Sequence, residues 1–183
     1  GQFGTRIQGG KDSASPRYIH TMLNSIVEYI YHPDDFEVIQ YLNDDGMTIE
    51  PEYYIPIIPM ILVNGSIGIG TGFSTNIPCF NPKDLINYIR LKLKNEKVNT
   101  LTPWYKNHKG TISDNISKGI VTQLNKTKIE VNELPIGYWT EDFKNTIENY
   151  MDNNPKIIKD YESHYTEKDV KFIKEYNPWL FPF

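Results

Sequence analysis

The sequence predicts an α+β protein, because patterns typical of helices and patterns typical of paired strands both recur along it. Residues 23–31 place apolar side chains on one face at helical spacing, which is the pattern of an amphipathic helix. Residues 38–42 and 47–49 flank Asp44-Asp45-Gly46, a sequence that favours the turn of a β-hairpin. Hydrophobic residues make up 39% of the 183 residues, which is enough for a core, so a disordered chain is excluded.

The N-terminal part is predicted to run from a loop into a short strand and then a helix. Residues 1–16 are rich in Gly and Ser and have no period, which indicates a loop. Residues 17–22 are short and mixed, and fit an extended strand. The helix over residues 23–31 is expected to end before Pro33, because proline cannot continue the hydrogen-bond pattern of a helix.

The middle of the chain is predicted to hold a buried segment, a glycine-rich turn region and a helix. Residues 55–63 form an apolar run expected to be buried, and residues 64–75 carry the glycines. Asn81 then favours a helix cap and Pro82 the first helical position. The apolar stripe of this helix would consist of Leu85, Ile86, Ile89 and Leu93.

Short strands and one more helix are predicted beyond Thr100. Residues 120–124 and 128–131 fit a pair of strands joined by a turn. Helical spacing returns after Thr140. Residues 175–183 combine aromatic residues with two prolines and fit neither a helix nor a solvated terminus.

The charge distribution limits how this chain could approach a nucleic acid. A net charge of −4 argues against a free-standing DNA-binding protein, because phosphate contacts need a basic surface. Residues 1–17 nevertheless carry a surplus of two positive charges, whereas residues 18–82 contain no Lys or Arg. If the chain contacts DNA, its N-terminal segment provides the attraction, and other parts of a larger protein provide the rest.

Composition also bounds the class of protein. No apolar run approaches the roughly 20 residues of a membrane helix, so no membrane partner is expected. A single cysteine, Cys79, excludes an internal disulfide and fits a reducing compartment. No targeting segment is visible. The chain begins with Gly inside a motif, and we expect it to be a fragment of a longer protein.

Two segments carry a specific resemblance. The first consists of Gly1-Gln2-Phe3-Gly4-Thr5-Arg6 and Gly9-Gly10-Lys11-Asp12-Ser13-Ala14-Ser15-Pro16-Arg17-Tyr18-Ile19. The second runs from Glu50 to Thr75 and includes Glu50-Pro51-Glu52-Tyr53-Tyr54 and Asn64-Gly65-Ser66-Ile67-Gly68-Ile69-Gly70-Thr71-Gly72. Together they resemble the DNA-cleaving core of type IIA DNA topoisomerases of the eukaryotic and large-virus type. The similarity continues more weakly downstream and fades after about Phe172.

The resemblance implies both an architecture and an activity. Residues 1–60 would be the C-terminal part of a winged-helix domain with the nucleophilic tyrosine, and residues 61–183 part of a tower domain. The parent would be an ATP-dependent homodimer that cuts both strands of double-stranded DNA through a 5′-phosphotyrosyl intermediate and reseals them. Mg²⁺ and ATP would bind outside this chain, in Toprim and ATPase domains, so the isolated fragment is expected to be inactive. The parent would act in the nucleus if cellular and eukaryotic, or at the replication site in the host cell if viral.

Tyr18 and Arg17 are the candidate catalytic residues. A phenol has a pKa of about 10 and is a weak nucleophile at neutral pH. A neighbouring guanidinium favours the phenolate and neutralises the phosphate under attack. An Arg-Tyr pair in a chain with 13 tyrosines is by itself more often structural. The resemblance makes Tyr18 the nucleophile and Arg17 its partner.

Ile69, Arg6 and Lys11 are the candidate DNA-binding residues. The glycines around Ile69 would leave one branched side chain protruding from a turn, and an apolar side chain can enter a base step and bend the duplex. The resemblance implies this role, because the matching isoleucine of the family intercalates. Without the resemblance, Ile69 would be interpreted as a core residue. The glycine pattern lacks the Gly-Lys-Ser/Thr ending of a phosphate-binding loop, so no nucleotide site is predicted there.

The remaining ionisable residues give weaker indications. His20 would share a face with Tyr18 on a strand, which would allow a role in proton transfer, with packing as the alternative. The acid pairs Asp34-Asp35 and Asp44-Asp45 are interpreted as solvated loop residues, and no metal site is predicted. Two other functions stay open. One is a non-catalytic DNA-bending or interaction module, and the other is a structural domain without DNA affinity.

Overall fold

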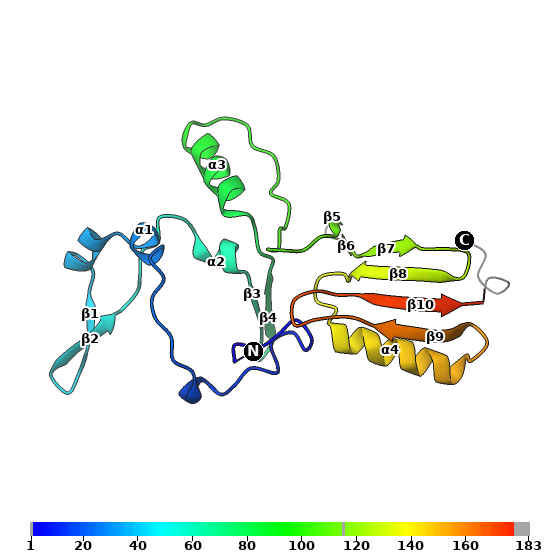
Figure 1. The fold of residues 1–183 in the computed structure, drawn as a ribbon. Coiled ribbons are helices and arrows are strands. Elements are labelled where there is room, and N and C mark those ends of the chain that lie inside the picture. Colours follow the sequence, from blue (N-terminus) through cyan, green and yellow to red (C-terminus); the bar gives the residue numbers. More distant parts are fainter. Residues whose placement is uncertain (1, 115, 178–183) are drawn as a thin grey trace. The chain divides into compact units, whose positions relative to one another are not determined.

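The computed structural model describes residues 2–114 and 116–177 and confirms an α+β protein (Figure 1). Contacts divide the chain into two compact units. Unit 1 combines the described residues up to His20 with those from Lys106 onward, and unit 2 is Thr21–Tyr105. These bounds differ from those of the expected domains, 1–60 and 61–183, and the winged-helix and tower assignments stay predictions.

Unit 1 is built on an antiparallel sheet in the order β7-β8-β10-β9. Its elements are the 3-10 helix η1 (Pro16–Tyr18) and β5 (Thr111–Ser113), β6 (Ile116–Lys118), β7 (Ile120–Gln123), β8 (Lys128–Glu133), α4 (Thr140–Asn153), β9 (Ile158–Ser163) and β10 (Phe172–Tyr176). The strands predicted over residues 120–124 and 128–131 and the helix predicted after Thr140 are confirmed. Residues 178–183 of the unusual C-terminal segment lie outside the described residues.

The core of unit 1 lies where α4 packs on the sheet, and α4 runs beside the strands in Figure 1. Phe172 of β10 is fully buried, and its ring centroid lies 5.1 Å from that of Phe143 in an edge-to-face contact. Ile147, one turn further along α4, is also buried. Each such side chain contributes about 1.5–3 kcal/mol by leaving water, so this layer is the stable base of the unit.

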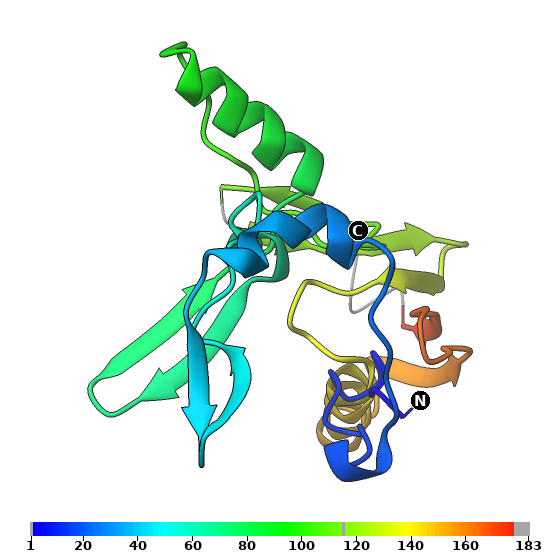
Figure 2. The ribbon, with the colours of Figure 1, turned by 90° about the vertical axis from the view of Figure 1, so that its left-hand side faces the viewer.

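Unit 2 consists of small elements with little core. These are α1 (Val27–Ile30), the 3-10 helix η2 (Pro33–Glu37), β1 (Tyr41–Asp44), β2 (Met47–Pro51), α2 (Met60–Asn64), β3 (Ser66–Gly70), β4 (Phe73–Ile77) and α3 (Pro82–Leu93). Strands β1 and β2 form one antiparallel hairpin, and β3 and β4 form another (Figures 1 and 2). Within the described residues of this unit, only Pro51 and Leu85 are buried.

Local sequence signals of unit 2 are partly confirmed. The turn at residues 44–46 is confirmed, with φ of 48° at Asp45 and 81° at Gly46. The cap of α3 is also confirmed, because the Asn81 side chain accepts a hydrogen bond from the Lys83 amide at 2.9 Å. No helix in the described part of the chain has the length and apolar character needed to cross a bilayer.

Four local predictions are wrong in whole or in part. Residues 17–22 do not form a strand, since Pro16–Tyr18 is a 3-10 turn, and the helix expected over residues 23–31 is only Val27–Ile30. Residues 55–63 are exposed or half-buried, because the described unit offers no layer to cover them. The glycine-rich region is mostly a β-hairpin, in which Gly68 pairs with Thr75 and Gly70 with Phe73.

Candidate active site

Tyr18 lies at the end of η1 with its side chain 70% exposed. Pro16 starts the turn with its φ already fixed, and the Tyr18 amide donates a hydrogen bond to the Ser15 carbonyl oxygen at 3.0 Å. The backbone of the tyrosine is therefore held while its ring stands in solvent. This is the arrangement that a nucleophile needs if its substrate is too large to enter a pocket.

Arg17 accompanies Tyr18, as the sequence predicts. Its guanidinium carbon lies 5.3 Å from the centroid of the Tyr18 ring, within the range of a cation–π contact. Both side chains are exposed, so a phosphate that reaches the phenol also meets the guanidinium. The pair thus forms one small, positively charged surface.

The N-terminal loop, residues 2–18, is a compact structure. The Asp12 carboxylate accepts hydrogen bonds from the Thr5 hydroxyl at 2.5 Å and the Thr5 amide at 2.9 Å, and these bonds lower the pKa of Asp12. The Gly10 amide donates to the Thr5 carbonyl oxygen at 2.9 Å. The stretch from Thr5 to Asp12 is therefore closed on itself, a few residues before Arg17 and Tyr18 in the chain.

Two glycines of the N-terminal loop serve close packing. Gly4 has φ +85°, and a Cβ there would lie 2.6 Å from the Cα of Gly10. Gly9 has φ +62°, and a Cβ there would overlap the ring of Trp139. Gly4 therefore lets the loop fold tightly on itself, and Gly9 lets it pack against Trp139 of the same unit.

Arg6 attaches the N-terminal loop to a buried carboxylate. Glu133 is 1% exposed, and Arg6 binds both of its oxygens, with 3.3 Å between Nη1 and Oε2. The amides of Lys109 and Leu134 donate to the same carboxylate at 3.0 and 2.8 Å. Desolvation raises the pKa of Glu133, but these hydrogen bonds outweigh it and hold the pKa below its usual value.

This ion pair affects the interpretation of Arg6. Much of its charge is neutralised inside unit 1, whereas Lys11 and Arg17 are exposed. DNA contact by Arg6 stays a prediction, and the structure gives it an anchoring contact as well. Sequence reasoning missed Glu133, because no local pattern links residues 127 positions apart.

Ile69 lies on β3, opposite Ser74 of β4, and is 93% exposed. A Cβ at the neighbouring Gly68 would meet no atom within 4 Å. The alternative that Ile69 fills a core is therefore wrong for the described chain. Its side chain has the exposure that a wedge requires.

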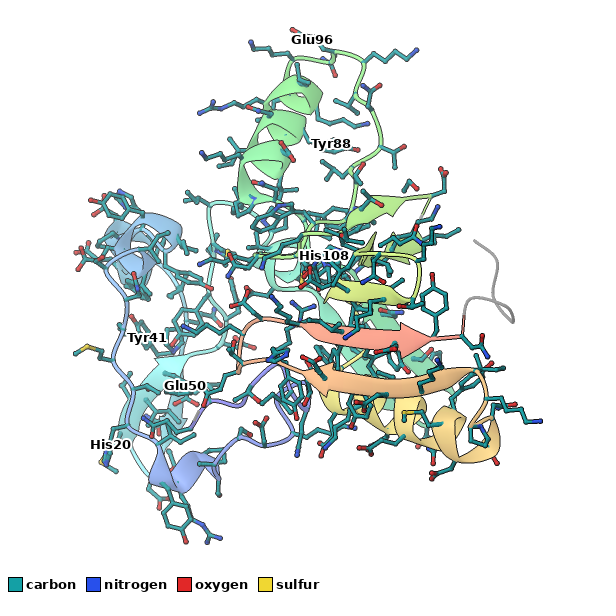
Figure 3. All side chains as sticks on the ribbon, turned by 45° about the vertical axis from the view of Figure 1, so that its right-hand side comes forward. His20, Tyr41, Glu50, Tyr88, Glu96 and His108 are labelled. Carbon is teal, nitrogen blue, oxygen red and sulfur yellow. The ribbon has the colours of Figure 1, made fainter. Side chains whose placement is uncertain are left out.

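The histidines show contrasting surroundings. His20, labelled in Figure 3, is exposed, so its ring does not pack into a core. The side chain of His108, also labelled there, is 5% exposed, and its Nδ1 lies 3.7 Å from Oε2 of Glu133. Neither ring nitrogen of His108 has a hydrogen-bond partner among the described residues. No group of three or more His, Cys, Asp or Glu within residues 2–114 and 116–177 is arranged to hold a metal ion.

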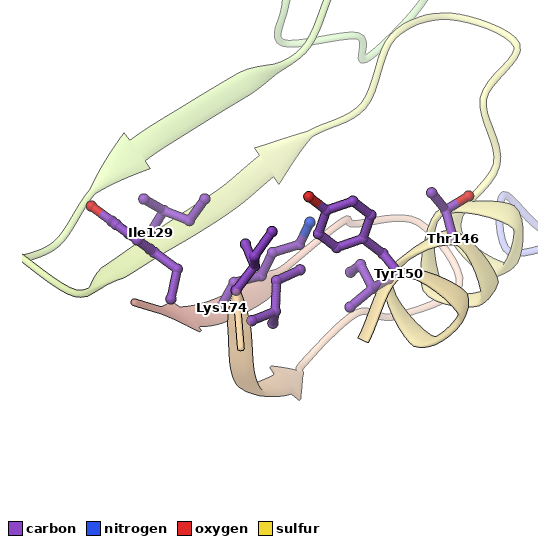
Figure 4. Close-up of a pocket in the computed structure, with 8 residues that line it drawn as sticks. Ile129, Thr146, Tyr150 and Lys174 are labelled. Atoms are coloured by element: carbon purple, nitrogen blue, oxygen red, sulfur yellow. The ribbon is translucent and has the colours of Figure 1, made fainter. Parts of the chain in front are cut away.

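A cavity of about 370 Å³ lies between α4 and the sheet of unit 1 (Figure 4). Lys174 projects into it from β10, with its ammonium 4.4 Å from the centroid of the Phe143 ring. Burial lowers the pKa of Lys174. The sequence did not predict this cavity, although Lys174 lies two residues from both Phe172 and Tyr176 and so shares their face of the strand.

Comparisons with known proteins agree on one family. The family model for DNA gyrase/topoisomerase IV, in its A subunit, matches residues 1–178. DNA topoisomerase 2-alpha of Homo sapiens is 46% identical over 182 residues, which cover 94% of this chain. DNA topoisomerase 2 of Caenorhabditis elegans is 45% identical over 187 residues, which cover 97%. The chain spans 12% of the length of each of these two relatives.

A solved structure shares the fold. The DNA-binding, cleavage and re-ligation domain of Plasmodium falciparum topoisomerase II matches with a TM-score of 0.89 and 41% identity. The match covers 98% of this chain and 25% of that chain. The shared fold therefore extends over nearly the whole of this chain.

Proposed function

Because the chain belongs to the DNA gyrase/topoisomerase IV family, we propose that it is part of the breakage-reunion core of an ATP-dependent type II DNA topoisomerase. The observation that carries this proposal is the exposed Arg17–Tyr18 pair at the end of a loop anchored on a packed unit. Its substrate would be double-stranded DNA, and its partner in the parent a second copy of the same protein. The parent would work in the nucleus if cellular and eukaryotic, or at the replication site if viral.

In the proposed reaction, the Tyr18 phenolic oxygen attacks the phosphorus of a DNA phosphodiester and gives up its proton. The bond from phosphorus to the 3′ oxygen breaks, and that oxygen takes up a proton to become a hydroxyl. The 5′ phosphate stays on Tyr18. Arg17 offsets the charge that develops on the phosphate. One phosphoester replaces another, so the reverse reaction reseals the strand without an external energy source.

The proposal assigns Mg²⁺ and ATP to parts of the parent outside this chain. No suitable group of metal ligands occurs in residues 2–114 and 116–177. Any Mg²⁺ or ATP that the parent uses would bind elsewhere, and no step above depends on them. We therefore expect the isolated chain not to relax supercoiled plasmid. Relaxation by the purified chain, free of contaminating enzyme, would contradict this expectation.

Tyr18→Phe in the parent tests the proposal. The variant should form no phosphotyrosine-linked DNA while it still binds DNA, because only the nucleophilic oxygen is lost. Tyr29→Phe is a matched control, since Tyr29 is 77% exposed. Adducts are measured by trapping protein on labelled DNA with denaturant. Recovery of adducts from the Tyr18→Phe protein would show that another residue is the nucleophile. Absence of adducts from the original parent would favour the alternative of a non-catalytic DNA-bending module.

A further inference from the structure

The β3–β4 hairpin, residues 66–77, has two different faces. Side chains alternate along a strand, and the register pairs Ile67 with Asn76 and Ile69 with Ser74. These four residues therefore share one face. Gly68 and Gly70 lie on the other face with Phe73 and Thr75. Figures 1 and 2 show β3 and β4 running side by side as a narrow ribbon.

The face with the two isoleucines is almost fully in water. Ile67 is 85% exposed and Ile69 is 93% exposed, and Ser74 and Asn76 across from them are also exposed. Two large aliphatic side chains side by side on a solvent face indicate a contact surface. The exposed amide of Asn76, directly opposite Ile67, adds a hydrogen-bond donor to that surface.

Charge indicates which partner this face fits. Residues 53–82 contain no Asp, Glu, Lys, Arg or His, although residues 18–52 carry eight acidic side chains. The hairpin therefore does not repel a polyanion through charges of its own. Apolar wedges combined with Asn side chains are what proteins use in the minor groove of DNA, where a wedge also bends the duplex away and opens the groove.

The spacing of the face matches DNA stacking. Side chains two residues apart on one strand face lie about 6.7 Å apart. That distance is about two base-pair rises of 3.4 Å. If Ile69 enters a base step, Ile67 reaches the sugars and base edges about two base pairs away. Asn76 lies across from Ile67 and reaches the same position.

We propose that Ile67 and Asn76 join Ile69 in a single minor-groove-binding face, an inference that rests on the proposed function. Ile69 enters the step, Ile67 packs against deoxyribose, and the Asn76 amide donates a hydrogen bond to adenine N3 or thymine O2. A G·C pair places the guanine amino group in the groove at that point, where it takes up space and loses water against the apolar side chain of Ile67. The face therefore selects A·T over G·C about two base pairs from the wedge.

The sharpest test leaves the hairpin unchanged and varies the DNA. The parent carrying Tyr18→Phe binds duplexes with A·T, G·C or inosine·C at the proposed pair, and dissociation constants are measured by fluorescence anisotropy. Inosine lacks the minor-groove amino group. We expect binding to G·C to be about fivefold weaker than to A·T, and inosine·C to restore most of the loss. Equal binding to all three duplexes, at every pair within three of the wedge, would overturn the base preference.

Variants of the same protein test the residues. Ile67→Ala and Asn76→Ala should each weaken binding about fivefold and reduce the preference for A·T. Thr75→Ala, on the other face of the hairpin, is the matched control and should change neither. Melting temperatures check folding, and Ile67→Val should keep most of the affinity. If Ile67→Ala and Asn76→Ala bind like Thr75→Ala, the inference fails, whereas the proposed function stands or falls separately on the Tyr18 adduct.

Discussion

The N-terminal loop and the β3–β4 hairpin use glycine in opposite ways. In the loop, a Cβ at Gly4 or Gly9 would collide with neighbouring atoms, so glycine lets the backbone pack tightly. In the hairpin, a Cβ at Gly68 or Gly72 would meet nothing within 4 Å. Gly68 leaves its place on β3 without a side chain, and Gly72, with φ +78°, lies in the turn between β3 and β4. Glycine thus allows tight packing in the N-terminal loop, whereas in the β3–β4 hairpin it leaves positions without a side chain.

The two regions also differ in the core on which each is packed. The loop is bound to Glu133, whose neighbours Val131 and Leu134 belong to the core of unit 1. The hairpin belongs to unit 2, where few described residues are buried. A nucleophile has to be held in place before its substrate arrives. A wedge only has to be exposed, because DNA itself would complete its packing.

The largest effect that follows from this contrast is expected at Glu133. Glu133→Ala should destabilise the chain by about 3–5 kcal/mol, because it leaves the Arg6 charge and two amides without their partner. Asp169→Ala is the matched control. It breaks the exposed 2.9 Å pair with Lys109 and should cost far less stability, because water and salt screen an exposed ion pair. Urea unfolding measures both. Similar losses for the two variants would show that the loop is not anchored as described.

Acid titration sharpens the same prediction. The folded pKa of Glu133 lies below the ordinary glutamate value of 4.5, so its contribution is fully present above pH 4.5. It should be lost as the pH falls through the lower, folded pKa. The stability difference between the original chain and Glu133→Ala should therefore shrink in acid. A difference that stays constant from about pH 7 to about pH 3 would exclude an ionised, hydrogen-bonded Glu133.

Arg17→Ala in the parent is expected to show the next largest effect, on rate and not on stability. Adduct formation should slow by about 10²–10³, because Arg17 stands beside the phenol and neutralises charge at the phosphate. DNA affinity should fall only modestly, since one exposed charge is lost. Lys11→Ala, which removes another exposed charge of the loop, should weaken binding without slowing cleavage at saturating DNA. Equal cleavage rates for the original protein and Arg17→Ala would make Arg17 structural.

Signals within a few residues were predictable from the sequence. The Asp44-Asp45-Gly46 turn and the Asn81 cap depend on backbone angles and hydrogen bonds between near neighbours. Burial was not predictable in the same way. Residues 55–63 are apolar but exposed or half-buried, because burial depends on a partner layer. The ion pair of Arg6 and Glu133 depends on tertiary packing, so it had no local signature.

The candidate site likewise combines features that depend on neighbours in sequence with features that depend on tertiary structure. The Arg17–Tyr18 pair was predicted because its members are adjacent in sequence and lie in a motif of the family. The pairing of Ile67 with Asn76 could not be predicted, because it depends on the register of two strands. The sequence predicted a glycine-rich turn there and therefore gave no register. Sequence thus indicated which residues could react, and the structure added what holds them and what stands beside them.

The smallest expected stability effect is at Ile69, and it tests the hairpin half of the comparison. A buried isoleucine cut to alanine loses about 2–5 kcal/mol through transfer and cavity terms. Ile69 is 93% exposed, so Ile69→Ala should change the free energy of unfolding by no more than about 0.5 kcal/mol. In the parent, the same change should reduce DNA bending, because nothing then fills the opened base step.

Ile147→Ala, at a buried position of α4, is the contrasting control. It should lose about 2–5 kcal/mol, which is what a buried isoleucine loses when it is cut to alanine. Thermal unfolding without DNA and energy transfer across a doubly labelled duplex separate the two quantities. A large loss of stability with unchanged bending would give Ile69 a packing role in the free protein. The hairpin would then depend on packing before DNA arrives, as the N-terminal loop does.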